Sequence, residues 1–159
     1  MQIMDFLTVD AIKMSLESKT KKDVIKELVD LLVKNGKVKD KKKMVQTLLE
    51  REELGSTGIG QGIAIPHGKS DTVSDLSAAF GLSPDGISFE SLDGEPVNIF
   101  FLLVAPEGAA GAHLKALARV SRLLRHQPTC EKLRAATKPE VIYALLTEPT
   151  NGGTSSQAA

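Results

Sequence analysis

The amino-acid sequence predicts a single α/β domain in which helices cover a central sheet. Two amphipathic helix patterns come first, three short strand patterns follow between residues 62 and 105, and helical spacing returns after residue 106. A chain of 159 residues is long enough to bury one core, and no repeat or linker divides it. We therefore expect one domain over residues 5–148 and a flexible C-terminal tail over residues 149–159.

Helical periodicity is clearest in the first third of the chain. The first predicted helix begins at a Ser18 or Thr20 cap and ends at Gly36. Its apolar stripe consists of Val24, Ile25, Leu28, Leu31 and Leu32. The second predicted helix begins at Asp40 and ends near Gly55, and its inward residues are Met44, Val45, Leu48 and Leu49. Lys41, Lys42 and Lys43 suggest a phosphate-binding patch, but in a first turn they are more simply solvated surface.

The pattern then changes to short apolar runs. GIAIP (62–66) and LSAAFGL (76–82) are strand candidates, and VNIFFLLVA (97–105) is apolar enough for a strand covered on both faces. SPDG (83–86) and LDGEP (92–96) have the composition of turns.

Helical spacing resumes over residues 112–126. The residues expected to face inward there are Leu114, Leu117, Val120 and Leu124. Two short helices are expected at 129–135 and 139–146, with Pro139 at a first helical position.

Composition excludes several classes of function. Lysine plus arginine equals aspartate plus glutamate at 20 each, and tryptophan is absent, so the sequence does not favour nucleic-acid binding. The single cysteine, Cys130, excludes an internal disulfide and suits a reducing compartment. The first residues include acidic side chains and lack a long apolar core, and no stretch approaches the ~20 apolar residues of a membrane span. We expect a cytoplasmic protein without direct membrane insertion.

The stretch GIGQGIAIPHGK, residues 58–69, contains the residues of greatest chemical interest. Its three glycines approach a dinucleotide fingerprint, but their spacing is wrong and they open a strand instead of a helix, so no nucleotide cofactor is expected. A metal site would draw on His67, His113, His126 and Cys130. No pair among these has the short spacing of a zinc site, although His67 and His113 could still meet in space, and no metal is expected.

His67 ends this stretch between Pro66 and Gly68. Pro66 restricts the direction of entry, Gly68 allows backbone or ligand to approach closely, and the preceding glycines can present N–H groups to an anion. This arrangement favours a histidine that accepts a phosphoryl group over one that only bonds a neighbouring carbonyl. Such a nucleophile must be a neutral imidazole, with donors or cations around the phosphoryl oxygens. The available candidates are His113, Arg51 and Lys69.

REELGSTGIGQGIAIPHGK followed by PVNIFFLLVAPEGAAGAHLKALARVSRLL resembles the enzyme IIA domains of the bacterial phosphoenolpyruvate-dependent phosphotransferase system. The resemblance is to the fructose/mannitol type, which includes a nitrogen-regulatory paralogue, and it covers about Phe6 to Glu148. It implies a mixed central sheet flanked by helices on both faces, and a phosphocarrier without a cofactor. It also implies that His67 accepts the phosphoryl group, that His113 orients or stabilises the phosphohistidine, and that Arg51 is the site arginine.

The resemblance further implies the partners. An HPr-type histidine phosphocarrier would be the phosphoryl donor. A solitary domain favours the nitrogen-regulatory branch, in which the phosphorylation state regulates partner proteins. One alternative is a sugar-specific IIA component that passes phosphate to a fructose/mannitol-type IIB during uptake, and another is an interaction module that keeps the fold without the chemistry. A phosphocarrier of either branch is a phosphotransferase component and not a self-contained catalyst.

Overall fold

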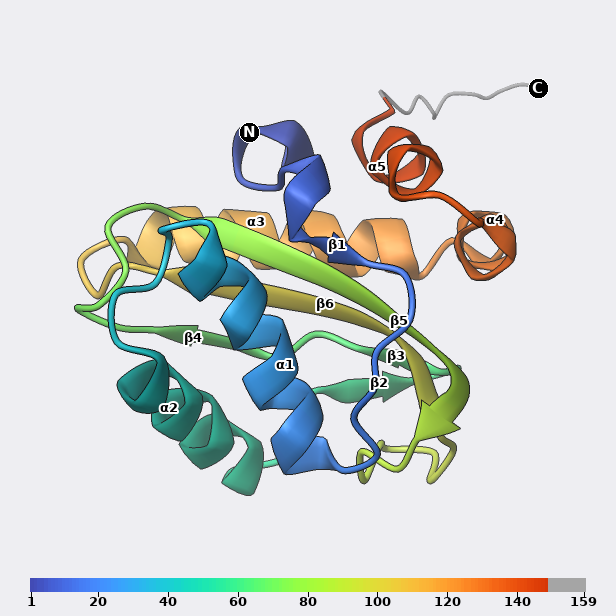
Figure 1. The fold of residues 1–159 in the computed structure, drawn as a ribbon, viewed down its shortest axis with the longest axis horizontal. Coiled ribbons are helices and arrows are strands. Elements are labelled where there is room, and N and C mark those ends of the chain that lie inside the picture. The colour runs from blue at the N-terminus through green and yellow to red at the C-terminus, as the bar shows by residue number, and fades with distance from the viewer. Residues whose placement is uncertain (149–159) are drawn as a thin grey trace.

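The structure, a computed structural model, describes residues 1–148 and contains a mixed six-stranded sheet with helices on both faces (Figure 1). The strand order is β1-β5-β6-β3-β2, and β4 also pairs with β6. This architecture confirms the predicted α/β class. The expected tail, residues 149–159, lies outside the described residues.

The described part of the chain contains five α-helices, two short 3-10 helices (Ile3–Asp5 and Val9–Ala11) and six strands. The helices are α1 (Lys21–Lys34), α2 (Lys41–Glu53), α3 (Ala110–Leu124), α4 (Gln127–Ala135) and α5 (Pro139–Thr147). The strands are β1 (Ile12–Lys13), β2 (Gly58–Gly60), β3 (Ile63–Ala64), β4 (His67–Lys69), β5 (Ser77–Ile87) and β6 (Val97–Ala105). None of the helices within residues 1–148 combines the length and apolar character needed to cross a bilayer.

Both N-terminal helices begin at the predicted caps. Thr20 Oγ1 accepts the Asp23 N–H at 3.1 Å, and an Asp40 carboxylate oxygen accepts the Lys43 N–H at 3.1 Å. The apolar stripe of α1 is buried except for Leu31, which is half-buried. Helices α1 and α2 cover one face of the sheet and α3 covers the other (Figure 1).

Strand β6 lies at the centre of the core. All of its residues except Asn98 are buried, because strands flank it on both sides and helices cover both faces. Two of its side chains pack edge-to-face with other aromatic rings, Phe101 with Phe80 and Phe100 with Phe89. Strand β4 runs parallel to the C-terminal half of β6 and brings His67 opposite Leu103.

Two local predictions are wrong. The predicted turn at residues 83–86 lies inside β5, where the register shifts between Leu82 and Ile87 and Gly86 has a φ of 79°. The turn residues therefore make an irregularity in a continuous strand and do not end it. Leu114, expected to face inward, is exposed, because the buried face of α3 starts one residue earlier, at His113.

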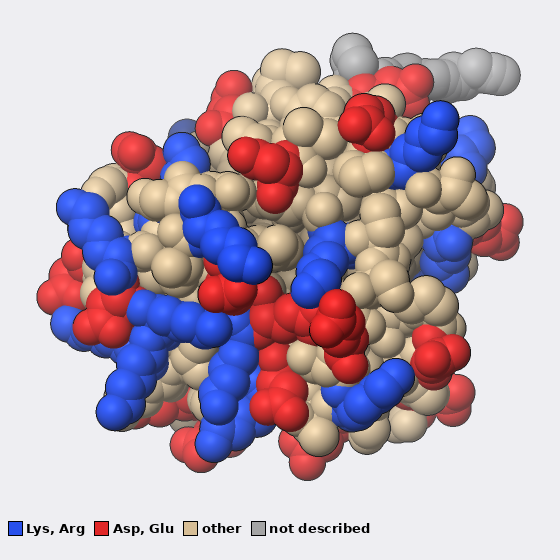
Figure 2. Space-filling model, in the orientation of Figure 1, with Lys and Arg blue, Asp and Glu red and all other residues tan. Residues whose placement is uncertain are grey.

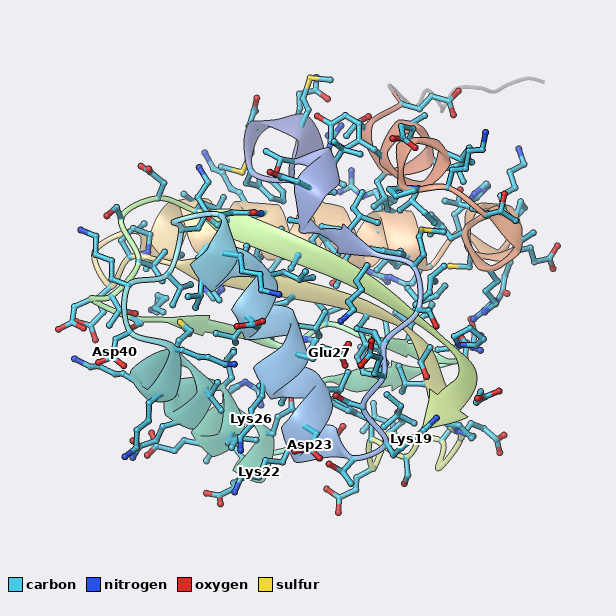
Figure 3. All side chains as sticks on the ribbon, in the orientation of Figure 1. Lys19, Lys22, Asp23, Lys26, Glu27 and Asp40 are labelled. Carbon is cyan, nitrogen blue, oxygen red and sulfur yellow. The ribbon has the colours of Figure 1, made fainter. Side chains whose placement is uncertain are left out.

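Charge is unevenly distributed although the chain is neutral overall. Residues 19–43 contain ten lysines and four acidic residues, and positive side chains gather on the face that α1 and α2 present (Figure 2). Figure 3 labels Lys22, Asp23 and Lys26 along α1. The Lys41–Lys43 run is exposed, and its first and last residues pair with carboxylates at 3.3 and 2.7 Å, as expected for solvated surface.

Candidate functional site

Residues 58–64 form a β-hairpin. Strands β2 and β3 are antiparallel, and Gln61 and Gly62 between them have φ values of 60° and 80°. A two-residue hairpin turn of this kind requires positive φ at both positions, which explains the glycine. Strand β2 was not predicted from the sequence.

The predicted anion-binding array of glycine N–H groups beside His67 is wrong. The Gly58 N–H donates to Ser56 Oγ at 3.0 Å, and the Gln61 N–H donates to an Asp93 carboxylate at 2.9 Å. The hairpin also lies far from His67, because Ile63 pairs with Ile99 whereas His67 pairs with Leu103. Four residues along β6 correspond to about 13 Å.

His67 opens β4 with its imidazole in a defined tautomer. Its Nδ1 lies 2.8 Å from the Ile65 carbonyl oxygen, and a carbonyl only accepts, so Nδ1 carries the proton and Nε2 has the lone pair. Burial lowers the pKa of His67 and the positive charge of Arg51 lowers it further, whereas the hydrogen bond to the Ile65 carbonyl and the charge of Glu52 oppose this shift. The ring is therefore a neutral imidazole at neutral pH, with Nε2 available as a nucleophile.

His113 lies in the first turn of α3, next to His67. The two ring centres are 5.7 Å apart. His113 is only 9% exposed, and its Nε2 is buried without a hydrogen-bond partner among the described residues. Because buried polar atoms are rarely left unpaired, Nε2 is a candidate ligand for a polar group brought to His67.

The pKa of His113 predicts how stability depends on pH. Folding lowers this pKa from 6.5 to about 4, because burial disfavours the imidazolium and the charges of His67 and Lys69 repel it. Between these two values the unfolded chain binds a proton that the folded chain does not, so the free energy of unfolding falls as pH falls below 6.5. We expect His113 to account for roughly 3 kcal/mol of this loss by pH 4. Urea unfolding of wild type and His113→Gln at pH 7, 5.5 and 4 measures the difference, and identical pH dependences would contradict it.

Arg51 and Lys69 each lie close enough to one of the two histidines for their charges to lower its pKa. Arg51 is in the last turn of α2, and its Nη1 donates to the Gly55 carbonyl at 2.8 Å. Its charge acts on His67, and the charge of Lys69 acts on His113. The structure thus brings together the four residues that sequence analysis proposed for a phosphoryl site.

Gly68 allows α2 to pack closely against β4 and does not open space for a ligand. A Cβ atom at this position would lie 3.3 Å from Leu48 Cδ2 and 3.4 Å from Thr47 Cγ2, both on α2. Glycine therefore lets α2 approach β4 closely, which places the end of α2 beside His67.

Glu52 is not among the site residues predicted from the sequence. Its carboxylate is buried, accepts the Thr57 N–H at 3.1 Å and the Thr57 hydroxyl, and pairs with Lys21 Nζ at 3.0 Å. Within the run Glu50–Glu53 it looks like one more surface charge. Its spacing of four residues from the buried Leu48 was the available signal, because i and i+4 share a helix face.

Metal ligands are not clustered in the described part of the chain. Among residues 1–148, no group of three or more His, Cys, Asp or Glu side chains is placed to hold a metal ion. Cys130 is buried, and its Sγ lies 3.1 Å from the Leu124 carbonyl oxygen, which suits the predicted packing role.

Residues 5–148 match the family described as "Phosphoenolpyruvate-dependent sugar phosphotransferase system, EIIA 2". The chain is 43% identical over 148 residues to the fructose-specific EIIABC component of Bacillus subtilis, which is 93% of this chain and 23% of that protein. It is 42% identical over 153 residues to a nitrogen regulatory protein of Bradyrhizobium diazoefficiens, covering 94% of this chain and 97% of the relative.

A solved structure supports the same family and fold. The nitrogen regulatory protein IIA-Ntr of Neisseria meningitidis matches with a TM-score of 0.85 and 33% identity, over 91% of this chain and 99% of that one. These matches confirm both the resemblance and the fold predicted from the sequence.

Proposed function

The chain belongs to the EIIA 2 family of the phosphoenolpyruvate-dependent phosphotransferase system, and on this premise we propose that it carries its phosphoryl group on Nε2 of His67. The hydrogen bond from His67 Nδ1 to the Ile65 carbonyl supports this proposal most directly, because it leaves the lone pair on Nε2. Nε2 attacks the phosphorus of a donor phosphohistidine, the donor N–P bond breaks, and its electron pair returns to the donor imidazole. No cofactor is needed.

The neighbouring groups suit the transferred charge. A phosphoryl group brings about −1.5 to −2 charges and three acceptor oxygens. Arg51 and Lys69 supply positive charge, and His113 supplies a buried nitrogen that has no partner in the described structure. We assign His113 to orienting and stabilising the phosphohistidine.

We assign the chain to the nitrogen-regulatory branch, with an HPr-type phosphocarrier as donor and regulated proteins as its targets. The 42% identity to the nitrogen regulatory protein and the TM-score of 0.85 with the IIA-Ntr structure support this assignment. The 43% identity to the fructose-specific component keeps transfer to a IIB domain as the alternative. An interaction module without chemistry is disfavoured, because it would need neither the two adjacent histidines nor the Arg51 charge.

Labelling tests the proposal. The protein is incubated with ³²P-phosphoenolpyruvate, the general phosphotransferase enzyme and HPr-type carriers from both branches, and the product is tested for acid-labile, base-stable phosphate. We expect stoichiometric labelling by a nitrogen-branch carrier. Labelling followed by rapid discharge to a fructose-type IIB domain would instead support the sugar branch. No label from any carrier would refute the phosphocarrier proposal.

Two exposed leucines flank the site and are proposed to contact the donor. Leu54 follows α2 and is 85% exposed, and Leu114 follows His113 and is 68% exposed. We expect Leu114→Glu to raise the KM for the donor about tenfold, equivalent to ~1.4 kcal/mol of binding, without lowering the melting temperature. The matched control is Leu92→Glu, because Leu92 is 81% exposed but lies beside the β2–β3 hairpin. Equal effects of the two substitutions would contradict a docking role for Leu114.

A further inference from the structure

We propose that Glu52 is a positioning residue that holds the Arg51 guanidinium beside His67 by fixing the turn between α2 and β2. This inference rests on the proposed function of His67. In this proposal the Glu52 carboxylate, which lies on the buried side of α2, affects phosphoryl transfer through the Arg51 side chain.

The carboxylate of Glu52 joins three segments of the chain. One oxygen accepts the Thr57 N–H at 3.1 Å and pairs with Lys21 Nζ at 3.0 Å, and the other accepts the Thr57 hydroxyl. Glu52 is therefore tied to the start of α1 and to the segment that enters β2. Its side chain is 3% exposed and that of Lys21 is 18% exposed, so water competes little for these bonds.

These bonds reach Arg51 through the turn. The helix ends with the Leu54 N–H bonded to the Arg51 carbonyl and the Gly55 N–H bonded to the Glu52 carbonyl. Arg51 Nη1 then donates to the Gly55 carbonyl at 2.8 Å. Because Glu52 holds Thr57, it fixes the position of Gly55, and Gly55 in turn holds one side of the guanidinium. Within residues 1–148 the other Arg51 donors make no hydrogen bond, which leaves them for an anion at His67.

The turn is also held from its other side. Ser56 Oγ donates to the Phe89 carbonyl at 2.8 Å, and Lys21 Nζ lies 4.8 Å from the centre of the Phe89 ring. Lys21 thus contacts both the Glu52 carboxylate and Phe89, the residue whose carbonyl accepts the Ser56 hydroxyl. Glutamine at position 52 would present an NH₂ group where three donors converge, so it cannot reproduce this arrangement.

A double-mutant cycle tests whether Glu52 acts through Arg51. Single-turnover transfer from the phosphorylated donor is measured for wild type, Glu52→Gln, Arg51→Ala and the double variant. We expect Arg51→Ala to slow transfer about a hundredfold and Glu52→Gln about tenfold, with less than about a twofold further effect of Glu52→Gln once Arg51 is absent. Glu53→Gln, the exposed neighbour on the same helix end, is expected to transfer at the wild-type rate.

The cycle distinguishes positioning from a general loss of folding. Independent, multiplicative effects of the two substitutions, or a wild-type rate for Glu52→Gln, would overturn the proposal. Should Glu52→Gln unfold at the assay temperature, Lys21→Met/Glu52→Gln also removes the ammonium that pairs with Glu52 and enters the cycle in its place.

A second readout does not depend on phosphorylation. We expect the Arg51 Nη1–H protons, which donate to the Gly55 carbonyl, to exchange with water about tenfold faster in Glu52→Gln than in wild type, and unchanged exchange would also overturn the proposal. If wild type accepts no phosphate, the assignment of His67 fails, and this exchange measurement still decides whether Glu52 positions Arg51.

Discussion

Replacing His67 with alanine is expected to abolish phosphoryl acceptance, with a loss of at least about a thousandfold in transfer rate. The substitution removes the nitrogen whose lone pair forms the new N–P bond. His113 does not substitute for it, because its Nε2 is buried within the protein. Uptake of label from phosphoenolpyruvate through an HPr-type donor measures this loss.

The control for His67→Ala is His126→Ala. His126 is exposed, bonds Thr129 at the start of α4 and is expected to label like wild type. Phosphorus NMR of the labelled wild type should show phosphate on Nε2, because Nδ1 is held by the Ile65 carbonyl. Phosphate on Nδ1 would contradict the tautomer argument, and labelling of His67→Ala at the wild-type rate would show that another residue is the acceptor.

The helices could be predicted because their signals are local. Thr20 and Asp40 accept N–H groups three residues ahead, and the apolar stripe of α1 repeats at helical spacing. The run from Val97 to Ala105 needed only its composition to be recognised as a buried strand. In each case the deciding residues lie within a few positions of one another.

The strands around residues 58–69 depend on contacts that are distant in sequence. Ile63 and His67 pair with Ile99 and Leu103 in β6, and no local pattern specifies that register. The same register separates the hairpin glycines from His67. Gly62 therefore serves the hairpin turn, and the prediction that the glycines bind an anion beside His67 is wrong.

The candidate site could be predicted from the sequence only in part. The resemblance to IIA domains proposed His67, His113 and Arg51, and the structure explains how residues so far apart become neighbours. Strand β4 lies beside β6, and α3 begins shortly after β6 ends, so the first turn of α3 meets the start of β4. Glu52 was missed because its burial depends on Lys21 and Thr57, which lie on other segments.

Replacing His113 with alanine is expected to slow phosphoryl transfer about a hundredfold while leaving the fold intact. The buried Nε2 has no hydrogen-bond partner in the described structure, so the free protein loses no bond when the ring is removed. The phosphorylated state loses an interaction with a phosphoryl oxygen. The effect should therefore fall on the rate of transfer and not on the affinity for the donor. Rapid-quench measurement over a range of donor concentrations separates the two.

Two further measurements decide whether His113 acts on the phosphoryl group itself. His113→Gln keeps a side-chain donor and is expected to recover part of the rate, whereas a simple packing role predicts that His113→Leu recovers more. In wild type, phosphorylation of His67 places negative charge near His113, because the two ring centres are 5.7 Å apart. This charge should raise the pKa of His113 above the value of about 4 that burial sets. NMR titration of the free and phosphorylated proteins measures that rise. An unchanged pKa, together with an unchanged rate in His113→Ala, would remove His113 from the site and leave Arg51 and Lys69 as the groups that balance the phosphoryl charge.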